Sequence, residues 1–134
     1  MMDSSESDAE ERTTRPRSLC PVLIVEDDED LREMMAQLLT IEGFKAATVA
    51  NGREALDYLH ANKPDVILLD LMMPVMDGWE FRRQQIADPD LAQVPVIVLS
   101  ALDQSRAAIV DAAAFLKKPL DFDRLLRLVR QHCR

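Results

Sequence analysis

Short apolar runs alternate with amphipathic patterns of helical period along most of the chain. The apolar runs predict five strands, over residues 19–25, 45–49, 65–70, 94–99 and 113–117. The segments that follow them repeat apolar residues at helical spacing and predict helices over residues 29–42, 52–61, 78–87, 104–112 and 121–133. Strands and helices that alternate in this way form a parallel sheet with helices on both faces. The pattern therefore predicts a doubly wound α/β domain.

Residues 1–18 lack this pattern. They mix acidic residues with arginines and contain no aliphatic run, which is typical of a disordered, solvated tail. In a chain of 134 residues we therefore expect one domain, over residues 19–134. The tail lacks the apolar core of a secretory signal, and no apolar run approaches the roughly 20 residues that span a bilayer. We expect a soluble, cytoplasmic protein without membrane insertion.

Charge and cysteine usage argue against several classes of function. The formal net charge of −8 opposes attraction to a phosphate backbone, so direct nucleic-acid binding is not expected. Cys20 and Cys133 form no Cys-x-x-Cys motif, and the chain has no clustered histidines. Neither a dithiol redox motif nor a zinc site is therefore predicted, and we expect two reduced thiols.

Acidic residues follow two of the predicted strands. Asp70 closes the apolar run of residues 66–69, and Glu26 and Asp27 follow the run of residues 22–25. An acidic cluster by itself is more often a solvated helix start, but a carboxylate at the end of a buried strand is costly unless it is paired. The carboxyl ends of parallel strands meet at one edge of the sheet, where ligands bind. Three carboxylates held there would repel one another unless a cation neutralised them, and oxygen ligands favour Mg²⁺.

Two further groups are predicted at the same edge. Ser100 ends the fourth apolar run, and Lys118 follows the fifth. Because Pro119 drives the preceding residue toward an extended conformation, Lys118 should stay at the strand end. A carboxylate, a divalent cation, an ammonium group and a hydroxyl suit phosphoryl transfer to the carboxylate, since each phosphoryl oxygen then has a partner. Before transfer, Lys118 is expected to pair with Asp70 and keep it ionised.

Four longer motifs contain these residues and occur in a fixed order. They are VLIVEDDEDLREMM, VILLDLMMPVMDGWEF, PVIVLSA and FLKKP. In this order the chain resembles, over residues 19–133, the receiver domain of two-component response regulators. Each motif alone is weak, whereas the ordered set is specific. The resemblance implies a flavodoxin-like sheet of five parallel strands with the order 2-1-3-4-5.

The resemblance also implies roles for the acidic residues. Asp70 matches the phosphoacceptor of the family. Asp27 matches the direct metal ligand, Glu26 a ligand that acts through water, and Met72 a ligand that uses its backbone carbonyl. Asp28 would then cap the first helix. The implied cofactor is Mg²⁺, for which Mn²⁺ is a substitute.

Three more residues match the switch of the family. Ser100 matches the hydroxyl residue that moves toward the phosphoryl group, and Phe115 the aromatic residue that turns inward behind it. Lys118 matches the lysine that binds the phosphoryl group. The family usually has a cis peptide before the following proline, which makes Lys118–Pro119 a candidate, since only X-Pro bonds adopt the cis form at low cost.

Two local features bear on how this switch would behave. Only 17 residues separate Ser100 from Lys118, fewer than receivers commonly have, and Ala112–Ala114 replace the usual Gly-Ala before the last strand. We therefore expect a shortened fourth helix, on the face that most receivers use for signalling. Met72 and Leu102 flank the site and are apolar, so they offer no group to orient water. We expect slow self-dephosphorylation.

The function predicted is that of a stand-alone, single-domain response regulator. A sensor histidine kinase or a histidine phosphotransfer protein would phosphorylate Asp70, and the chain is not expected to be a dedicated enzyme. Since the sequence stops after the last predicted helix, its output would be contact with a downstream protein, or phosphoryl transfer along a relay. One alternative is a receiver-like interaction module that works without phosphorylation. A second is an aspartate-dependent phosphohydrolase, although that class commonly has a second aspartate where this chain has Met72.

Overall fold

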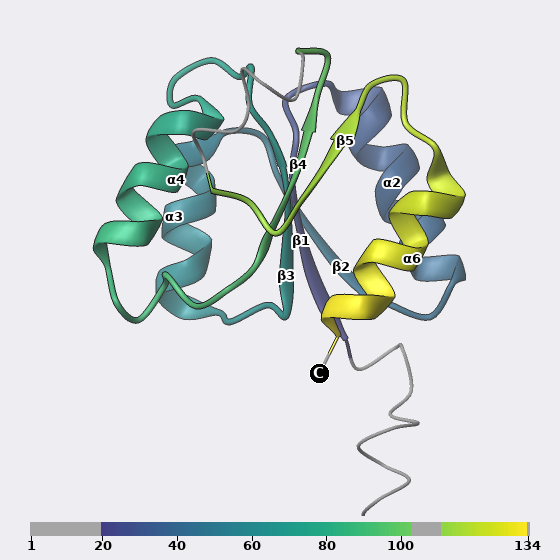
Figure 1. Cartoon of the computed structure of the whole chain (residues 1–134), viewed down its shortest axis with the longest axis horizontal. Coiled ribbons are helices and arrows are strands. Elements are labelled where there is room, and N and C mark those ends of the chain that lie inside the picture. The colour runs from purple at the N-terminus through teal and green to yellow at the C-terminus, as the bar shows by residue number, and fades with distance from the viewer. Residues whose placement is uncertain (1–19, 103–110, 134) are drawn as a thin grey trace, which may run out of the picture.

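The computed structural model describes residues 20–102 and 111–133. It contains one sheet of five parallel strands in the order β2-β1-β3-β4-β5 (Figure 1). The strands are β1 (Pro21–Val25), β2 (Lys45–Val49), β3 (Val66–Asp70), β4 (Val96–Ser100) and β5 (Ala114–Lys117). The described helices are α2 (Glu29–Ile41), α3 (Gly52–Ala61), α4 (Gly78–Ala87) and α6 (Phe122–His132). The predicted fold class and strand order are confirmed.

The predicted element boundaries agree with the structure to within two residues wherever the structure describes them. The fourth strand begins at Val96 and not at residue 94, because Val94 still belongs to a turn in which its amide donates to Leu91 O. The predicted helix over 104–112 and the predicted tail over 1–18 lie outside the described residues, except that Asp111 and Ala112 are described and are not helical.

The helices cover both faces of the sheet. Figure 1 shows α2 and α6 on one face and α3 and α4 on the other. All five residues of β3 and of β4 are buried, which explains why these strands are continuous apolar runs and do not alternate. Separate apolar clusters fill the space between each helix pair and the sheet. Among the described helices, none combines the length and the apolar composition that a membrane crossing requires.

Each described helix begins directly after an aspartate or asparagine. The capping side chains accept hydrogen bonds from backbone amides of the first turn and belong to Asp28, Asn51, Asp77 and Asp121. Asp28 is thus a cap, as predicted. Such caps satisfy amides that have no partner within the helix. Because each of these helices follows a strand, their positive ends lie at the carboxyl edge of the sheet, which favours anions there.

The loop between β3 and α4 lies tightly against its surroundings. Gly52 donates its amide to Met76 O (2.9 Å), and Gly78 donates to Leu71 O (2.9 Å). A Cβ atom at Gly78 would lie 2.6 Å from Asp70 O, so only glycine permits this approach. The loop that follows Asp70 is therefore held by backbone contacts at both ends.

A disulfide joins Cys20 to Cys133, with the two Cα atoms 5.7 Å apart. The prediction of two reduced thiols is therefore wrong. Cys133 caps the C-terminal end of α6, and the packing of that helix on the sheet brings it to the start of β1. The two cysteines are 113 residues apart in the sequence, and their pairing depends on the docked helix and not on any local motif.

Candidate functional site

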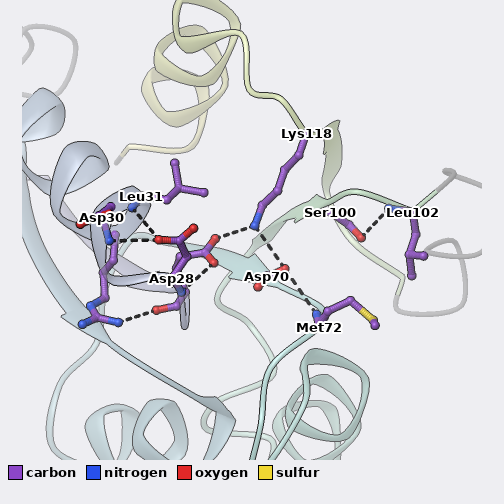
Figure 2. Close-up of polar contacts among 10 residues, drawn as sticks. Asp28, Asp30, Leu31, Asp70, Met72, Ser100, Leu102 and Lys118 are labelled. Atoms are coloured by element: carbon purple, nitrogen blue, oxygen red, sulfur yellow. Dashed lines mark hydrogen bonds and ion pairs between the residues drawn. The ribbon is translucent and has the colours of Figure 1, made fainter.

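Four strands deliver polar side chains to one edge of the sheet. Glu26 directly follows β1, Asp70 ends β3, Ser100 ends β4, and Lys118 directly follows β5. The strand register explains why they meet, since Val25 pairs with Leu69, Asp70 with Leu99, and Ser100 with Lys117. Figure 2 shows Lys118 extending toward Asp70, with Ser100 above and to the right of Asp70 and Met72 below it.

The Lys118 ammonium group lies between two carboxylates. Its Nζ atom is 2.9 Å from Glu26 Oε1 and 3.6 Å from Asp70 Oδ1. Glu26 and Asp70 are only 1% and 3% exposed, respectively, whereas the Lys118 side chain retains 22% exposure. Lys118 therefore pairs with Asp70, as the sequence suggested, but its shorter contact is with Glu26.

The environment of this ion pair shifts the pKa of both Asp70 and Lys118. Burial raises the pKa of Asp70 to about 7, with further increases from the charge of Glu26 and a hydrogen bond with Asp27, while the charge of Lys118 opposes the rise. Burial acts to lower the pKa of Lys118, but the hydrogen bond with Glu26 and the charges of Asp70 and Glu26 outweigh it and raise that pKa. The site thus carries more negative charge than one lysine neutralises.

Three carboxylates at this edge are arranged as a metal site would require. Glu26, Asp27 and Asp70 each offer an oxygen, and these oxygens lie within 4.8 Å of one another. Asp27 is exposed, so an ion bound here would keep access to water. Oxygen ligands of this kind, left with a net negative charge, fit a hard divalent cation.

Backbone hydrogen bonds order the groups around Asp70. The Met72 amide donates to Asp70 Oδ1 (3.3 Å), and the Leu102 amide donates to Ser100 Oγ (3.0 Å) (Figure 2). The Lys118 amide donates to Ser100 O (2.8 Å), and the Lys118–Pro119 bond is cis. Ser100 is fully buried beneath these contacts.

Phe115 and Met72 lie at the margins of the site. Phe115 is half-buried and packs against the apolar cluster on the α3 and α4 side of the sheet. Met72 is 57% exposed. Together with Trp79 at the start of α4 and other residues of the β3–α4 loop, Met72 lines an open cleft of about 300 Å³.

Sequence reasoning did not identify Arg32 as part of the site. Its Nη1 atom donates to Glu26 O (2.9 Å) and so holds the backbone of the residue that contacts Lys118. Arg32 lies in the first turn of α2, where an arginine facing solvent is equally ordinary. Only the fold shows that this side chain turns back toward the strand end.

The match to a protein family decides how these features are classified. The sequence profile of the response regulator receiver domain matches residues 22–130. The chain belongs to the response regulator receiver domain family. The four motifs and the carboxylate edge of this receiver domain lie within the matched residues. The chain is therefore a component of two-component signal transduction.

Curated relatives of this receiver domain are longer proteins. The response regulator MprA of Mycolicibacterium vanbaalenii is 38% identical over 113 residues, which cover 81% of this chain and 48% of that protein. The receiver domain thus spans about half the length of the curated relatives that it matches.

Solved receiver domains have the same fold. The receiver domain of a histidine kinase from Syntrophus aciditrophicus superposes with a TM-score of 0.76 and 35% identity, covering 83% of this chain and 87% of that one. The receiver domain of a sensor histidine kinase from Pseudomonas aeruginosa has a TM-score of 0.77 and 28% identity, covering 84% and 95%. That second structure has a magnesium ion coordinated in its active-site cleft.

Proposed function

We propose that this receiver domain is a phosphorylation-dependent switch that accepts a phosphoryl group on Asp70. The donor would be a sensor histidine kinase or a histidine phosphotransfer protein, and the cofactor Mg²⁺. The proposal depends above all on one observation: the Asp70 carboxylate is buried at the strand edge, 3.6 Å from the Lys118 ammonium group and within 4.8 Å of carboxylate oxygens of Glu26 and Asp27.

The residues that would hold the metal are Glu26, Asp27 and Asp70, with the Met72 carbonyl as a further oxygen ligand. Their carboxylates are close enough to share one ion. When bound, the ion neutralises carboxylate charge and stabilises the negative charge that develops on the transferring phosphoryl group. The magnesium in the related Pseudomonas aeruginosa receiver domain supports this assignment.

Asp70 would act as the nucleophile. One carboxylate oxygen attacks phosphorus, the bond from phosphorus to the histidine nitrogen of the donor breaks, and the released imidazole takes up a proton. This requires an ionised carboxylate, and the pKa of Asp70 near 7 leaves it partly protonated at neutral pH without a cation. Neutralisation of the neighbouring carboxylates therefore matters for activation as well as for binding.

Lys118 and Ser100 would bind the product. Lys118 is already within ion-pair distance of Asp70 and can shift its contact from Glu26 to a phosphoryl oxygen. Ser100 lies on the neighbouring strand, and its hydroxyl can donate to a second oxygen while Leu102 still donates to it. A new dianionic group thus acquires a cation and a hydrogen-bond donor from two strands, which is the physical basis of the switch.

The aspartyl phosphate is expected to be long-lived. Met72 and Leu102 flank the acceptor and carry no polar side-chain group that would orient a water molecule for attack. The output would be an altered contact with a downstream protein. Phe115, which belongs to the edge strand β5 and packs against the apolar cluster on the α3 and α4 side of the sheet, would transmit the change to that edge of the sheet.

The decisive experiment is intact mass measurement after incubation with acetyl phosphate and Mg²⁺. Wild type should gain one phosphoryl group, and Asp70→Asn and an EDTA-treated sample should gain none. Asp57→Asn, an exposed aspartate on α3, is the matched control and should behave as wild type. No adduct on the wild type would favour a module that works without phosphorylation, and turnover of a generic phosphomonoester would favour a phosphohydrolase.

A further inference from the structure

A second cluster of reactive side chains lies at the other end of the sheet. Cys20, directly before β1, is 1% exposed, whereas Cys133, directly after α6, is partly exposed. They are joined as a disulfide, and a carboxylate oxygen of Asp65 lies within 4.8 Å of both sulfurs. Two sulfurs bonded to each other are not thiolate ligands, so in this state the cluster is not a metal site.

The disulfide is the strongest attachment of the last turn of α6. Further back, the helix is held by buried apolar residues, the last of which is Val129. Beyond it, Arg130 Nη2 contacts Glu42 Oε1 (2.8 Å), and both side chains are 34% exposed. An ion pair at such exposure contributes little. Without the disulfide, the end of α6 would be held by this ion pair and by the packing of the partly buried Cys133 side chain against the apolar cluster.

We propose that Cys20 and Cys133 form a thiol–disulfide redox site that locks the C-terminal turn of α6 onto β1 when oxidised and releases it when reduced. The reductant is a small thiol. Its thiolate attacks the sulfur of the more exposed Cys133, and the sulfur of Cys20 leaves and takes up a proton. A second small thiol then resolves the mixed disulfide, leaving two protein thiols and one small-molecule disulfide. Oxidation runs the same exchange in reverse with a small-molecule disulfide.

Asp65 would control how fast this exchange occurs. Its carboxylate beside both sulfurs places a negative charge where an attacking thiolate must approach and where the leaving thiolate forms. Like charges at this separation repel one another. Asp65→Asn keeps the size of the side chain and removes the charge, so reduction by glutathione should become about three- to tenfold faster.

The proposed redox site is separate from the edge of the sheet that carries Asp70. Cys20 precedes the first residue of β1, whereas Glu26 follows its last residue, so the length of the strand lies between them. Reduction should therefore leave the rate of phosphorylation by acetyl phosphate unchanged. A failure of this proposal can thus be distinguished from a failure of the proposed phosphorylation of Asp70.

The experiment equilibrates the full chain in glutathione buffers of graded redox ratio. Free thiols are counted by alkylation and intact mass, and hydrogen exchange is followed by peptide. We expect no free thiols at the oxidising end and two at the reducing end. Reduction should speed amide exchange at least tenfold in the last turn of α6, with α3 unchanged, and lower the thermal midpoint by about 5–15 °C.

Cys133→Ser is the matched control, because it removes the more exposed sulfur and leaves buried Cys20 in place. Its exchange in α6 should match reduced wild type in every buffer. Three results would overturn the proposal: two free thiols in oxidised glutathione, no redox effect on exchange in α6, or a disulfide that dithiothreitol reduces but millimolar glutathione does not. The last result would make the bond a permanent cross-link and not a switch.

Discussion

The ammonium group of Lys118 is closer to Glu26, at 2.9 Å, than to the proposed phosphoacceptor Asp70, at 3.6 Å. Glu26 therefore acts on Asp70 in two ways. Its charge raises the pKa of Asp70 directly, and it also draws the lysine toward itself. The affinity of Asp70 for a proton thus depends on a carboxylate from a different strand.

Replacing Glu26 should make Asp70 more acidic. In Glu26→Gln the like charge is lost and Lys118 is free to pair with Asp70, so the pKa of Asp70 should fall below its wild-type value of about 7, by about one unit. Carbon-13 NMR titration of the aspartate carboxyl groups in EDTA measures this. Glu29→Gln, at an exposed position in α2, is the control, and an unchanged Asp70 titration in Glu26→Gln would contradict the interpretation.

The raised pKa of Asp70 should make the free energy of unfolding depend on pH. Because its folded pKa is about 7 and its usual value is 3.8, the folded chain binds this proton more tightly than the unfolded chain. The stability that Asp70 contributes through its proton is therefore fully present below pH 3.8 and is lost as the pH rises through about 7. In EDTA at pH 8, we expect Asp70→Asn to be more stable than wild type by on the order of 1–3 kcal/mol.

Urea unfolding at a series of pH values, followed by the fluorescence of Trp79, the single tryptophan of the chain, measures this difference. The advantage of Asp70→Asn should vanish near pH 4. Saturating Mg²⁺ should stabilise the wild type at pH 8 and leave Asp70→Asn nearly unaffected. Equal stability of the two proteins at every pH without metal would show that ionising the buried Asp70 carboxylate does not destabilise the fold.

The two buried glycines should differ in their effect on the site. A Cβ atom at Gly78 would lie 2.6 Å from Asp70 O and 2.7 Å from the Leu71 Cα atom, so Gly78→Ala must displace the end of β3. We expect a loss of about 1–3 kcal/mol in stability and a phosphorylation rate at least tenfold lower.

Gly52→Ala is the matched control, because its Cβ would lie 2.8 Å from Met76 O, on the far side of the same loop. It should lose similar stability but retain most of the phosphorylation rate. If both variants were phosphorylated at the wild-type rate, the position of the Asp70 carbonyl would not matter for the acceptor.

Val75 adopts a backbone conformation that a β-branched residue rarely tolerates. Its φ angle is 68°, it is 83% exposed, and the Met76 amide donates to Pro74 O (2.7 Å) across it. This three-residue turn with positive φ is strained for any residue with a Cβ atom. Val75→Gly should therefore raise the free energy of unfolding by about 1 kcal/mol, measured by urea denaturation. Val75→Ala should gain much less, and a loss of stability in Val75→Gly would refute the strain.

Arg82 should contribute far more to stability than its neighbour Arg83. The Arg82 side chain is buried and donates to Gln85 Oε1 and to Asp111 O, both at 2.8 Å, so it ties α4 to the segment before β5. Arg82→Leu leaves these acceptors without that donor and should cost about 1–3 kcal/mol in chemical denaturation. Arg83→Leu removes a 75% exposed side chain that pairs with Glu80, three residues earlier in the same helix, and should change stability by less than about 0.5 kcal/mol. Similar losses for both would argue against the Arg82 link.

The sequence alone determined the sheet and the location of the site. Continuous apolar runs such as residues 66–69 are typical of strands buried on both faces, and their alternation with helices indicates a parallel sheet. In a parallel sheet all carboxyl ends share one edge, so Asp70, Ser100 and Lys118 had to meet there once their strands were recognised. The apolar runs are patterns of neighbouring residues, and the shared edge follows from the parallel arrangement of the strands.

Only the tertiary structure decided the contacts between segments far apart in the chain. The pairing of Cys20 with Cys133, the preference of Lys118 for Glu26, and the hydrogen bond from Arg82 to the backbone at residue 111 each depend on how one element docks on another. The same holds for the raised pKa of Asp70, which arises from burial and from a charge on another strand. Distances of a few ångströms between distant segments are set by the packing of the whole core, and no local pattern of residues specifies them.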